Sequence, residues 1–171
     1  MKLTAGIPGL RGTLGRTRAT IAALGAAVIL VVLAGVVGVA ARDLAAADAR
    51  AADRAELRSA APAIVERVFS VDLARWRADR AAARAVTGGD FARSYAAALD
   101  GPPPAGTAAV RWQVDAVAVG EAGHGAGETL LHAVVTTRAV DGVETTRRTT
   151  VRTGFTGRDG HWVLTSMEVL A

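Results

Sequence analysis

Apolar residues follow three different spacings along this chain, and the first is an unbroken run. Residues 19–41 carry no charge and are flanked by Arg18 and Arg42. A helix of these 23 residues rises about 34 Å, more than the roughly 30 Å of a bilayer's hydrocarbon core. Eleven of the residues are Ile, Leu or Val, and each favours insertion by about 0.3–0.6 kcal/mol. The run therefore predicts a transmembrane helix.

The second spacing is helical. Residues 42–61 are rich in Ala, Arg and Asp and have few large apolar side chains, which predicts a solvated helical stalk. From Pro62, well suited to a first helical position, apolar residues recur at helical intervals. They are Ile64, Val65, Val68, Phe69, Leu73 and Trp76. Periodicity alone extends this helix to Val86.

Glycines then separate this helix from a shorter one. The segment 87–89 (TGG) is a typical C-terminal stop. Asp90 is expected to be the N-cap of the short helix, which has Phe91, Tyr95 and Leu99 on one face. Residues 100–104 (DGPPP) end the helical part of the chain.

The third spacing is that of strands. Residues 110–116 alternate apolar with polar, as in a sheet with one buried face. Residues 129–140, 143–156 and 161–170 follow, joined by the hairpin signals Asp141-Gly142 and Asp159-Gly160. Helices followed by a four-stranded antiparallel sheet predict an α+β domain, with the helices covering the concave face of a curved sheet.

The charges indicate the orientation of the predicted span. Lys2, Arg11, Arg16 and Arg18 precede it without any acidic residue, so the N-terminus is expected in the cytoplasm. The alternative is a cleaved signal peptide, with Gly38 and Ala40 at the processing site. Apolar regions of signal peptides run about 7–15 residues, which favours the uncleaved anchor. The predicted parts are a basic tail (1–18), the span (19–41), the stalk (42–61) and an extracytoplasmic domain (62–171).

The basic pI of about 10.8 does not indicate a nucleic-acid-binding protein. Of the 20 basic residues, 16 follow the span, together with all 16 acidic residues. The extracytoplasmic part is therefore neutral and lacks the basic field that nucleic acid binding requires. The chain has no cysteine, which excludes disulfides and thiolate metal sites.

Few residues suggest a chemical site. His124, His132 and His161 have no metal-ligand spacing, and residues 123–127 (GHGAG) are expected to form a hairpin loop because no Lys-Ser pair follows them. Asp115 and Tyr95 are a candidate acid–base pair for an isomerase-like site. Alternation, however, places Asp115 on the face opposite Trp112 and Val114, as expected of a solvated carboxylate. We predict no cofactor and no metal.

Two groups of residues have alternative interpretations. Aromatic side chains from the helices and the strands are candidates either to line a pocket for an apolar ligand or simply to fill the core. They are Trp76, Phe91, Tyr95, Trp112, Phe155 and Trp162. The second group, Arg147, Arg148 and Arg152, forms either a basic stripe or a protection of an edge strand against aggregation.

Several segments resemble a known family. They are SVDL at 70–73, Trp76, TGGDF at 87–91, Tyr95 and GHWVL at 160–164. Together with the predicted anchor and stalk, they resemble the Mce-associated membrane proteins of actinobacteria, which accompany mammalian-cell-entry lipid import systems. The family usually has aromatic residues at the positions of Val71 and Leu73, and one glycine in the turn. The resemblance implies a cone-shaped fold like nuclear transport factor two and ketosteroid isomerase, and a chain break near Ser70.

The resemblance also implies a function. We expect a single-pass protein of the cell membrane that acts as a non-catalytic accessory or docking subunit of a lipid or sterol import system. Its expected partners are other subunits of that complex, and the membrane through residues 19–41. One alternative is an extracytoplasmic module that binds a lipid or sterol. The other is an enzyme of the ketosteroid isomerase or cyclase type, which shares the fold.

Overall fold

The computed structural model describes residues 13–170, with solvent exposure described for Gly35, Gly38 and residues 41–170. The chain forms two compact units, 1–47 and 48–171. Helix α1 (Thr13–Phe69) contains the predicted span 19–41, most of whose side chains lie outside the described residues, as does most of the predicted basic tail. Among the helical residues described in full, no stretch is long and apolar enough to cross a bilayer.

The packed part of α1 begins earlier than the sequence indicated. Leu57 and Ala61, predicted to lie in a solvated stalk, are fully buried, whereas Leu44 is exposed as expected. They continue the stripe of Ile64, Val65 and Val68 by one helical turn, since residues three or four apart share a face. Pro62 lies inside α1 and does not begin it.

Helix α1 ends at Phe69, which confirms the break near Ser70; the unbroken periodic helix to Val86 is wrong. After the short strand β1 (Val71–Asp72) come α2 (Trp76–Ala85), α3 (Gly89–Ser94) and α4 (Ala96–Asp100). The predicted N-cap at Asp90 is also wrong. Gly88 precedes α3, and Asp90 lies in its first turn, where its carboxylate pairs with Arg93.

The sheet is antiparallel with strands in sequence order, which confirms the α+β class and the predicted meander. Its long strands are β2 (Thr107–Gly123), β3 (Ala126–Ala139), β4 (Glu144–Arg158) and β5 (His161–Leu170). The predicted count of four strands is wrong, because β1 pairs with residues 109–110 as a fifth strand. A two-residue strand is too short for alternation to reveal it.

Tight turns join the long strands. His124-Gly125 and Asp159-Gly160 have positive φ at both residues, as in the two-residue turns that match the twist of a hairpin. At the Asp141-Gly142 turn, Gly142 has a φ of 89°. All three lie between consecutive strands, so the hairpins predicted at 123–127, 141–142 and 159–160 are confirmed.

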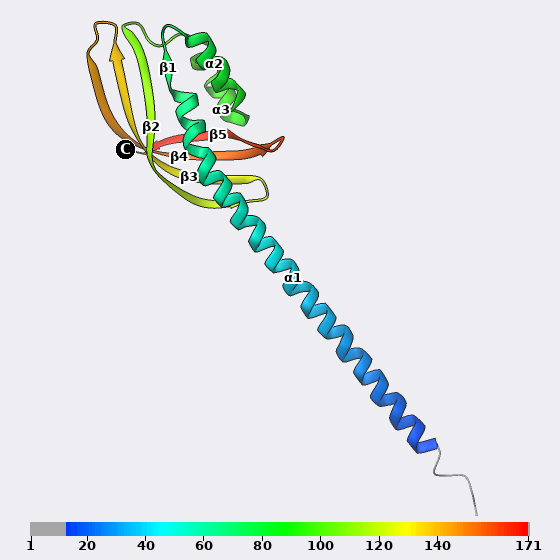
Figure 1. Cartoon of the computed structure of the whole chain (residues 1–171). Helices are drawn as coiled ribbons and strands as arrows, with labels where there is room; N and C mark the ends of the chain where they lie inside the picture. Colours follow the sequence, from blue (N-terminus) through cyan, green and yellow to red (C-terminus); the bar gives the residue numbers. More distant parts are fainter. Residues whose placement is uncertain (1–12, 171) are drawn as a thin grey trace, which may run out of the picture. The chain divides into compact units, whose positions relative to one another are not determined.

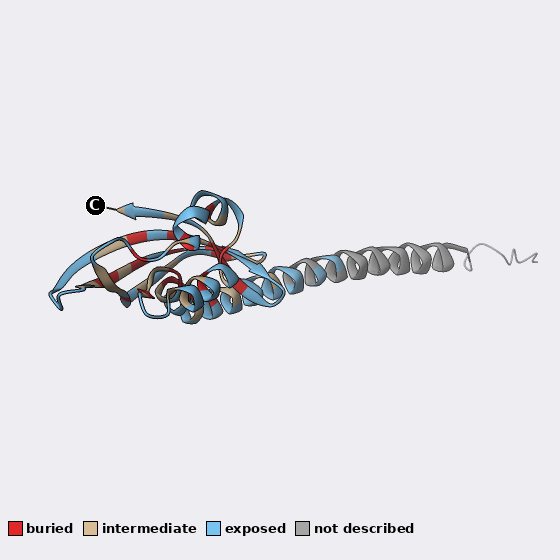
Figure 2. Cartoon of the chain, turned by 90° about the horizontal axis from the view of Figure 1, so that it is seen from above, coloured by how far each residue is buried: buried red, intermediate tan, exposed pale blue. Residues whose placement is uncertain are grey.

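The core lies between the buried stripe of α1 and the concave face of the curved sheet (Figures 1 and 2). The strands contribute large buried side chains, namely Trp112, Leu131, Val151, Phe155 and Leu164. The hydroxyls of Thr129 and Thr153 are also buried and hydrogen-bond each other at 2.7 Å. Pairing satisfies both polar groups inside an apolar core.

Residues 109–114 of β2, on the side away from β3, are covered by β1 and by side chains at the end of α1. The Trp112 N–H donates to Ser70 Oγ at 3.0 Å, and the Val114 N–H donates to Glu66 Oε1 at 2.8 Å. Both side chains come from the end of α1 or the residue that follows it. They occupy backbone donors that an edge strand otherwise presents to another chain.

Candidate functional site

The six aromatic residues predicted as possible cavity lining do not converge on one cavity. Phe91, Trp112, Phe155 and Trp162 are buried in the core, whereas Trp76 is half-buried and Tyr95 is exposed. Four of the six line a hollow, namely Phe155, Trp112, Trp162 and Trp76. Each of these four lines a different hollow. These hollows are separate, so the six residues do not line one shared cavity.

Phe69 packs against two of these aromatic rings. Its ring lies 5.9 Å from that of Phe91, edge to face, and 4.8 Å from that of Trp112. Tyr95 stacks on Phe91 with a centroid distance of 4.4 Å. These separations are typical of packed aromatic pairs. Side chains thus fill the space between α1, α3 and β2.

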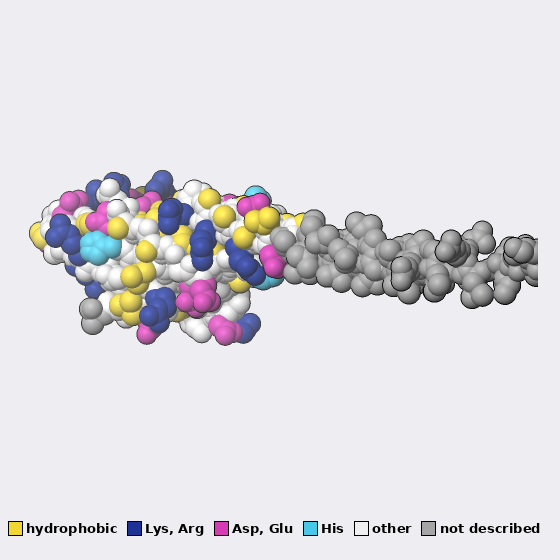
Figure 3. Space-filling view, turned by 90° about the horizontal axis from the view of Figure 1, so that it is seen from below, with side chains coloured by type: hydrophobic (Ala, Val, Ile, Leu, Met, Phe, Trp, Pro, Cys, Tyr) yellow, Lys and Arg dark blue, Asp and Glu magenta, His cyan; other side chains and the backbone are white. Residues whose placement is uncertain are grey.

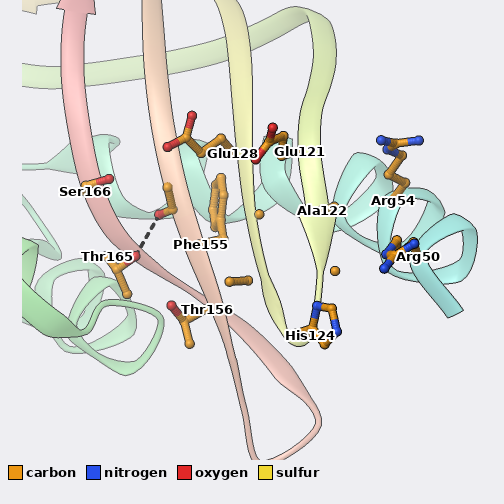
Figure 4. Close-up of a pocket in the computed structure, with 14 residues that line it drawn as sticks. Arg50, Arg54, Glu121, Ala122, His124, Glu128, Phe155, Thr156, Thr165 and Ser166 are labelled. Carbon is orange, nitrogen blue, oxygen red and sulfur yellow. Dashed lines mark hydrogen bonds between the residues drawn. The ribbon is translucent and has the colours of Figure 1, made fainter. Parts of the chain in front are cut away.

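One hollow of about 650 Å³ lies beside the β2–β3 turn and is lined by charged and small residues (Figure 4). Arg50 and Arg54 project from α1, while Glu121 and Glu128 project from β2 and β3. None of the four takes part in an ion pair with another described residue. Both signs of charge meet water here, which is unlike a lipid cavity.

A second hollow, of about 920 Å³, follows the edge of β2 beside β1 and α2. Three of its charged residues, Asp72, Arg75 and Asp79, are engaged with one another. Asp79 pairs with Arg75 at 3.3 Å and accepts the Asp72 N–H at 2.9 Å. Asp72 in turn lies 3.8 Å from Arg138. This groove is therefore a polar surface, part of whose charge is neutralised by ion pairs within the domain.

Asp115 lies on the outer face of the sheet, opposite Trp112 and Val114, as predicted. Val114 is opposite Ala133 and Ala116 is opposite His132, so Asp115 is the extra residue of a bulge. Its carboxylate is 2.6 Å from His132 Nδ1, and both side chains are partly exposed. The hydrogen bond with His132 is the main reason why the pKa of Asp115 lies below its ordinary value.

The candidate acid and base are not brought together. Tyr95 lies between α3 and α4 and stacks on a core ring, whereas Asp115 faces the other side of the sheet. The partner of Asp115, His132, was not predicted from the sequence. That pairing depends on the bulge, which shifts the register of β2 against β3 and has no local signal.

The other histidines occupy a turn and a strand start. His124 has a φ of 55° in the β2–β3 turn, and His161 is the exposed first residue of β5. Within the described part of the chain, no three His, Asp or Glu side chains are grouped so that they could hold a metal ion.

Arg147, Arg148 and Arg152 lie on β4, which has a neighbouring strand on each side. Protection of an edge strand is therefore the wrong explanation for them. Arg152 lies 3.4 Å from Glu168 of β5 on the same face. It thus links two strands inside the sheet.

The residues before α3 contact the first part of β5, although the two segments are far apart in the sequence. The Leu164 N–H donates to the Val86 carbonyl at 2.9 Å, and the Gly88 N–H donates to the Leu164 carbonyl at 2.8 Å. A Cβ added at Gly88 would lie 3.3 Å from Val163 Cγ2, and Gly89 has a φ of 56°. Glycine thus permits both the close approach and the turn into α3. The sequence offers no local signal for this contact.

No protein-family model matches the chain, and no curated protein does either. Among solved structures, Aln2 from a Streptomyces species is similar, with 20% sequence identity and a TM-score of 0.39. The similarity covers 57% of this chain and 80% of the Aln2 chain.

Proposed function

We propose that this chain is a single-pass membrane protein whose extracytoplasmic domain is a non-catalytic accessory or docking subunit of an Mce-type lipid import system. In this proposal residues 19–41 anchor the domain, and the curved sheet with its helices forms the cone-shaped fold of nuclear transport factor two and ketosteroid isomerase. The partners are other subunits of the importer.

The observation that carries the proposal is the junction between residues 86–88 and Leu164. The segments TGGDF and GHWVL carry the resemblance to the Mce-associated proteins. The first segment ends at Phe91 and the second begins at Gly160, 69 positions later. They are joined by the backbone bonds of Gly88 and Leu164. Shared motifs that hydrogen-bond to each other stabilise the fold. Such motifs are expected of a family that has a fold in common rather than a reaction.

The filling of the core supports a docking role over transport of a ligand by this domain. Phe69 packs against Phe91 and against Trp112, so side chains fill the space between these rings. The hollows of about 650 and 920 Å³ are both lined by charged residues of both signs. Basic and acidic side chains are also interspersed on the face shown in Figure 3. Interspersed charges suit contacts with proteins better than contacts with one highly charged ligand.

Affinity purification tests the proposed partners. The full chain, carrying a C-terminal tag, is extracted from native membranes with mild detergent, and the proteins bound to it are identified by mass spectrometry. We expect subunits of a lipid importer among them, in excess over a purification with an unrelated tagged single-pass protein. Enrichment of no importer subunit would contradict the proposal.

Complementation tests the role of the anchor. In a strain that lacks this protein, the full chain should restore lipid uptake, because tethering raises the local concentration of weak contacts. The same domain exported without residues 1–41 should restore much less at equal abundance. Full restoration by trace amounts of the exported domain would instead favour an enzyme or a soluble lipid carrier.

A further inference from the structure

The hollow of about 650 Å³ beside the β2–β3 turn has its charges grouped by sign. Arg50 and Arg54 lie together on α1, whereas Glu121 and Glu128 lie together on the paired strands β2 and β3 (Figure 4). Like charges four residues apart on a helix repel each other, and so do like charges on neighbouring strands. Each group therefore gains from a partner of opposite charge.

That partner is not supplied within the described structure. Elsewhere in the domain, opposite charges lie together, as in Arg84 with Asp100 at 2.8 Å and Arg152 with Glu168 at 3.4 Å. No such ion pair joins the arginines and the glutamates of the hollow. A simple anion or cation would be attracted by one group and repelled by the other. A molecule that carries both charges complements both groups.

Glycines make room for the polar groups of this hollow. A Cβ at Gly123 would lie 3.1 Å from Arg50 Cγ, and a Cβ at Gly154 would collide with Ser166 Oγ. The absence of side chains there allows the stem of Arg50 and the hydroxyl of Ser166 to lie against the strands. The volume is within the range of about 300–1,000 Å³ that is usual for small-molecule sites.

We propose that this hollow binds a small zwitterion, whose phosphate or carboxylate group lies at Arg50 and Arg54 and whose ammonium group lies at Glu121 and Glu128. Guanidinium groups bind such anions through paired, charge-assisted hydrogen bonds, and carboxylates accept hydrogen bonds from an ammonium group. A free zwitterion and the headgroup of phosphatidylethanolamine share this chemistry. The inference does not depend on the proposed function.

Isothermal titration calorimetry of the full chain in an uncharged maltoside detergent tests the ligand class. The probe is glycerophosphoethanolamine, which carries both charges, and the comparison compounds are glycerol 3-phosphate and ethanolamine, which carry one each. We expect the probe to bind about tenfold or more tightly than either compound, because each charged contact that is lost weakens binding by about this factor. No binding of the probe, or equal affinity for all three compounds, would overturn the proposal.

Two double variants remove one sign of charge and preserve side-chain size: Arg50→Gln with Arg54→Gln, and Glu121→Gln with Glu128→Gln. Each should weaken binding of the probe about tenfold or more. The arginine variant should also lose the preference for the probe over ethanolamine, and the glutamate variant its preference over glycerol 3-phosphate. A merely structural role would not produce these reciprocal changes in selectivity. Unchanged affinity in both variants would contradict the assigned positions of the two charged groups.

The matched controls are Arg58→Gln and Glu144→Gln, because both side chains are exposed and lie outside the hollow. Both should bind the probe as the natural chain does, and circular dichroism checks that all variants remain folded. Equal weakening by the controls would show that the probe senses the overall charge, and would overturn the proposal.

Competition distinguishes the two sources of the ligand. The same titration is carried out in mixed micelles that contain phosphatidylethanolamine or phosphatidylglycerol, whose headgroup has no ammonium group. Weaker binding of the probe in phosphatidylethanolamine alone would identify a lipid headgroup as the ligand. Equal binding in both micelles would identify a free zwitterion.

Discussion

Trp162 connects the last strand to the packed stripe of α1. It is buried and lies with Ala60, Ile64 and Val86 around one small hollow. Trp162→Ala should reduce the free energy of unfolding by about 3–5 kcal/mol, because truncation of a large buried ring leaves a cavity. Urea unfolding of residues 48–171 measures it, with Val143→Ala as the exposed control. A loss below about 1 kcal/mol would mean that the ring contributes little to the core.

Gly127 of β3 lies against Leu57 of α1. A Cβ at this position would lie 2.5 Å from Leu57 Cδ2 and 3.2 Å from Ala122 Cβ. Gly127→Ala should therefore destabilise the domain by about 1–3 kcal/mol through overpacking. Gly120→Ala is the control, because its added Cβ would meet its nearest atom at 3.6 Å. Equal unfolding midpoints for both variants would show that α1 moves aside at little cost.

The pair of Asp115 and His132 makes a prediction about titration. Its hydrogen bond lowers the pKa of Asp115 in the folded state. A carboxyl with a lowered folded pKa contributes stability above its unfolded pKa, and this contribution is lost as pH falls through the folded pKa. His132→Ala should raise the pKa of Asp115 in an NMR titration, whereas His161→Ala should leave it unchanged. An unchanged pKa in His132→Ala would contradict His132 as the main cause and would leave the lesser ones, a backbone hydrogen bond and the charge of Arg148.

At the scale of elements, side chains at the end of α1 accept hydrogen bonds from the edge of β2. Removal of an acceptor leaves a partly buried N–H without its partner, which costs about 1–3 kcal/mol. Glu66→Ala and Ser70→Ala should each lower stability by this amount and speed hydrogen exchange at the amides of Val114 and Trp112, respectively. Glu56→Ala, a change of an exposed side chain on the same helix, is the control. Slow exchange at both amides in the double variant would mean that another group covers the edge.

The sequence predicts those elements whose signals are local. Alternation identified the long strands, and Asp-Gly pairs identified two hairpins, because side-chain direction and turn geometry depend on neighbouring residues. Three features depend on contacts far along the chain and were missed: β1, the burial of Leu57, and the contact of Leu164 with residues 86–88. The candidate site follows the same rule. Alternation placed Asp115 on the correct face, but its partner His132 is set by a bulge in the register.

At the scale of the whole molecule, the charges before residue 19 determine a testable topology. Arg11, Arg16 and Arg18 should retain the N-terminus in the cytoplasm. An impermeant thiol reagent on intact cells should then label Arg158→Cys but not Thr4→Cys, and both should be labelled after lysis. Labelling at position 4 alone would reverse the orientation. Release of the domain into the medium would indicate a cleaved signal peptide.

The position of α1 before the sheet also has a consequence for biosynthesis. The ribosome makes the apolar stripe at 57–68 first, and Leu164, which helps to cover it, follows roughly 100 residues later. At about 5–20 residues per second, the nascent helix spends on the order of 5–20 s without its complete cover. The hairpins of β2 to β5 join consecutive strands, so they can fold as they emerge. The stripe is fully covered only after the last strand is made, so part of its apolar surface stays exposed to other apolar surfaces until then.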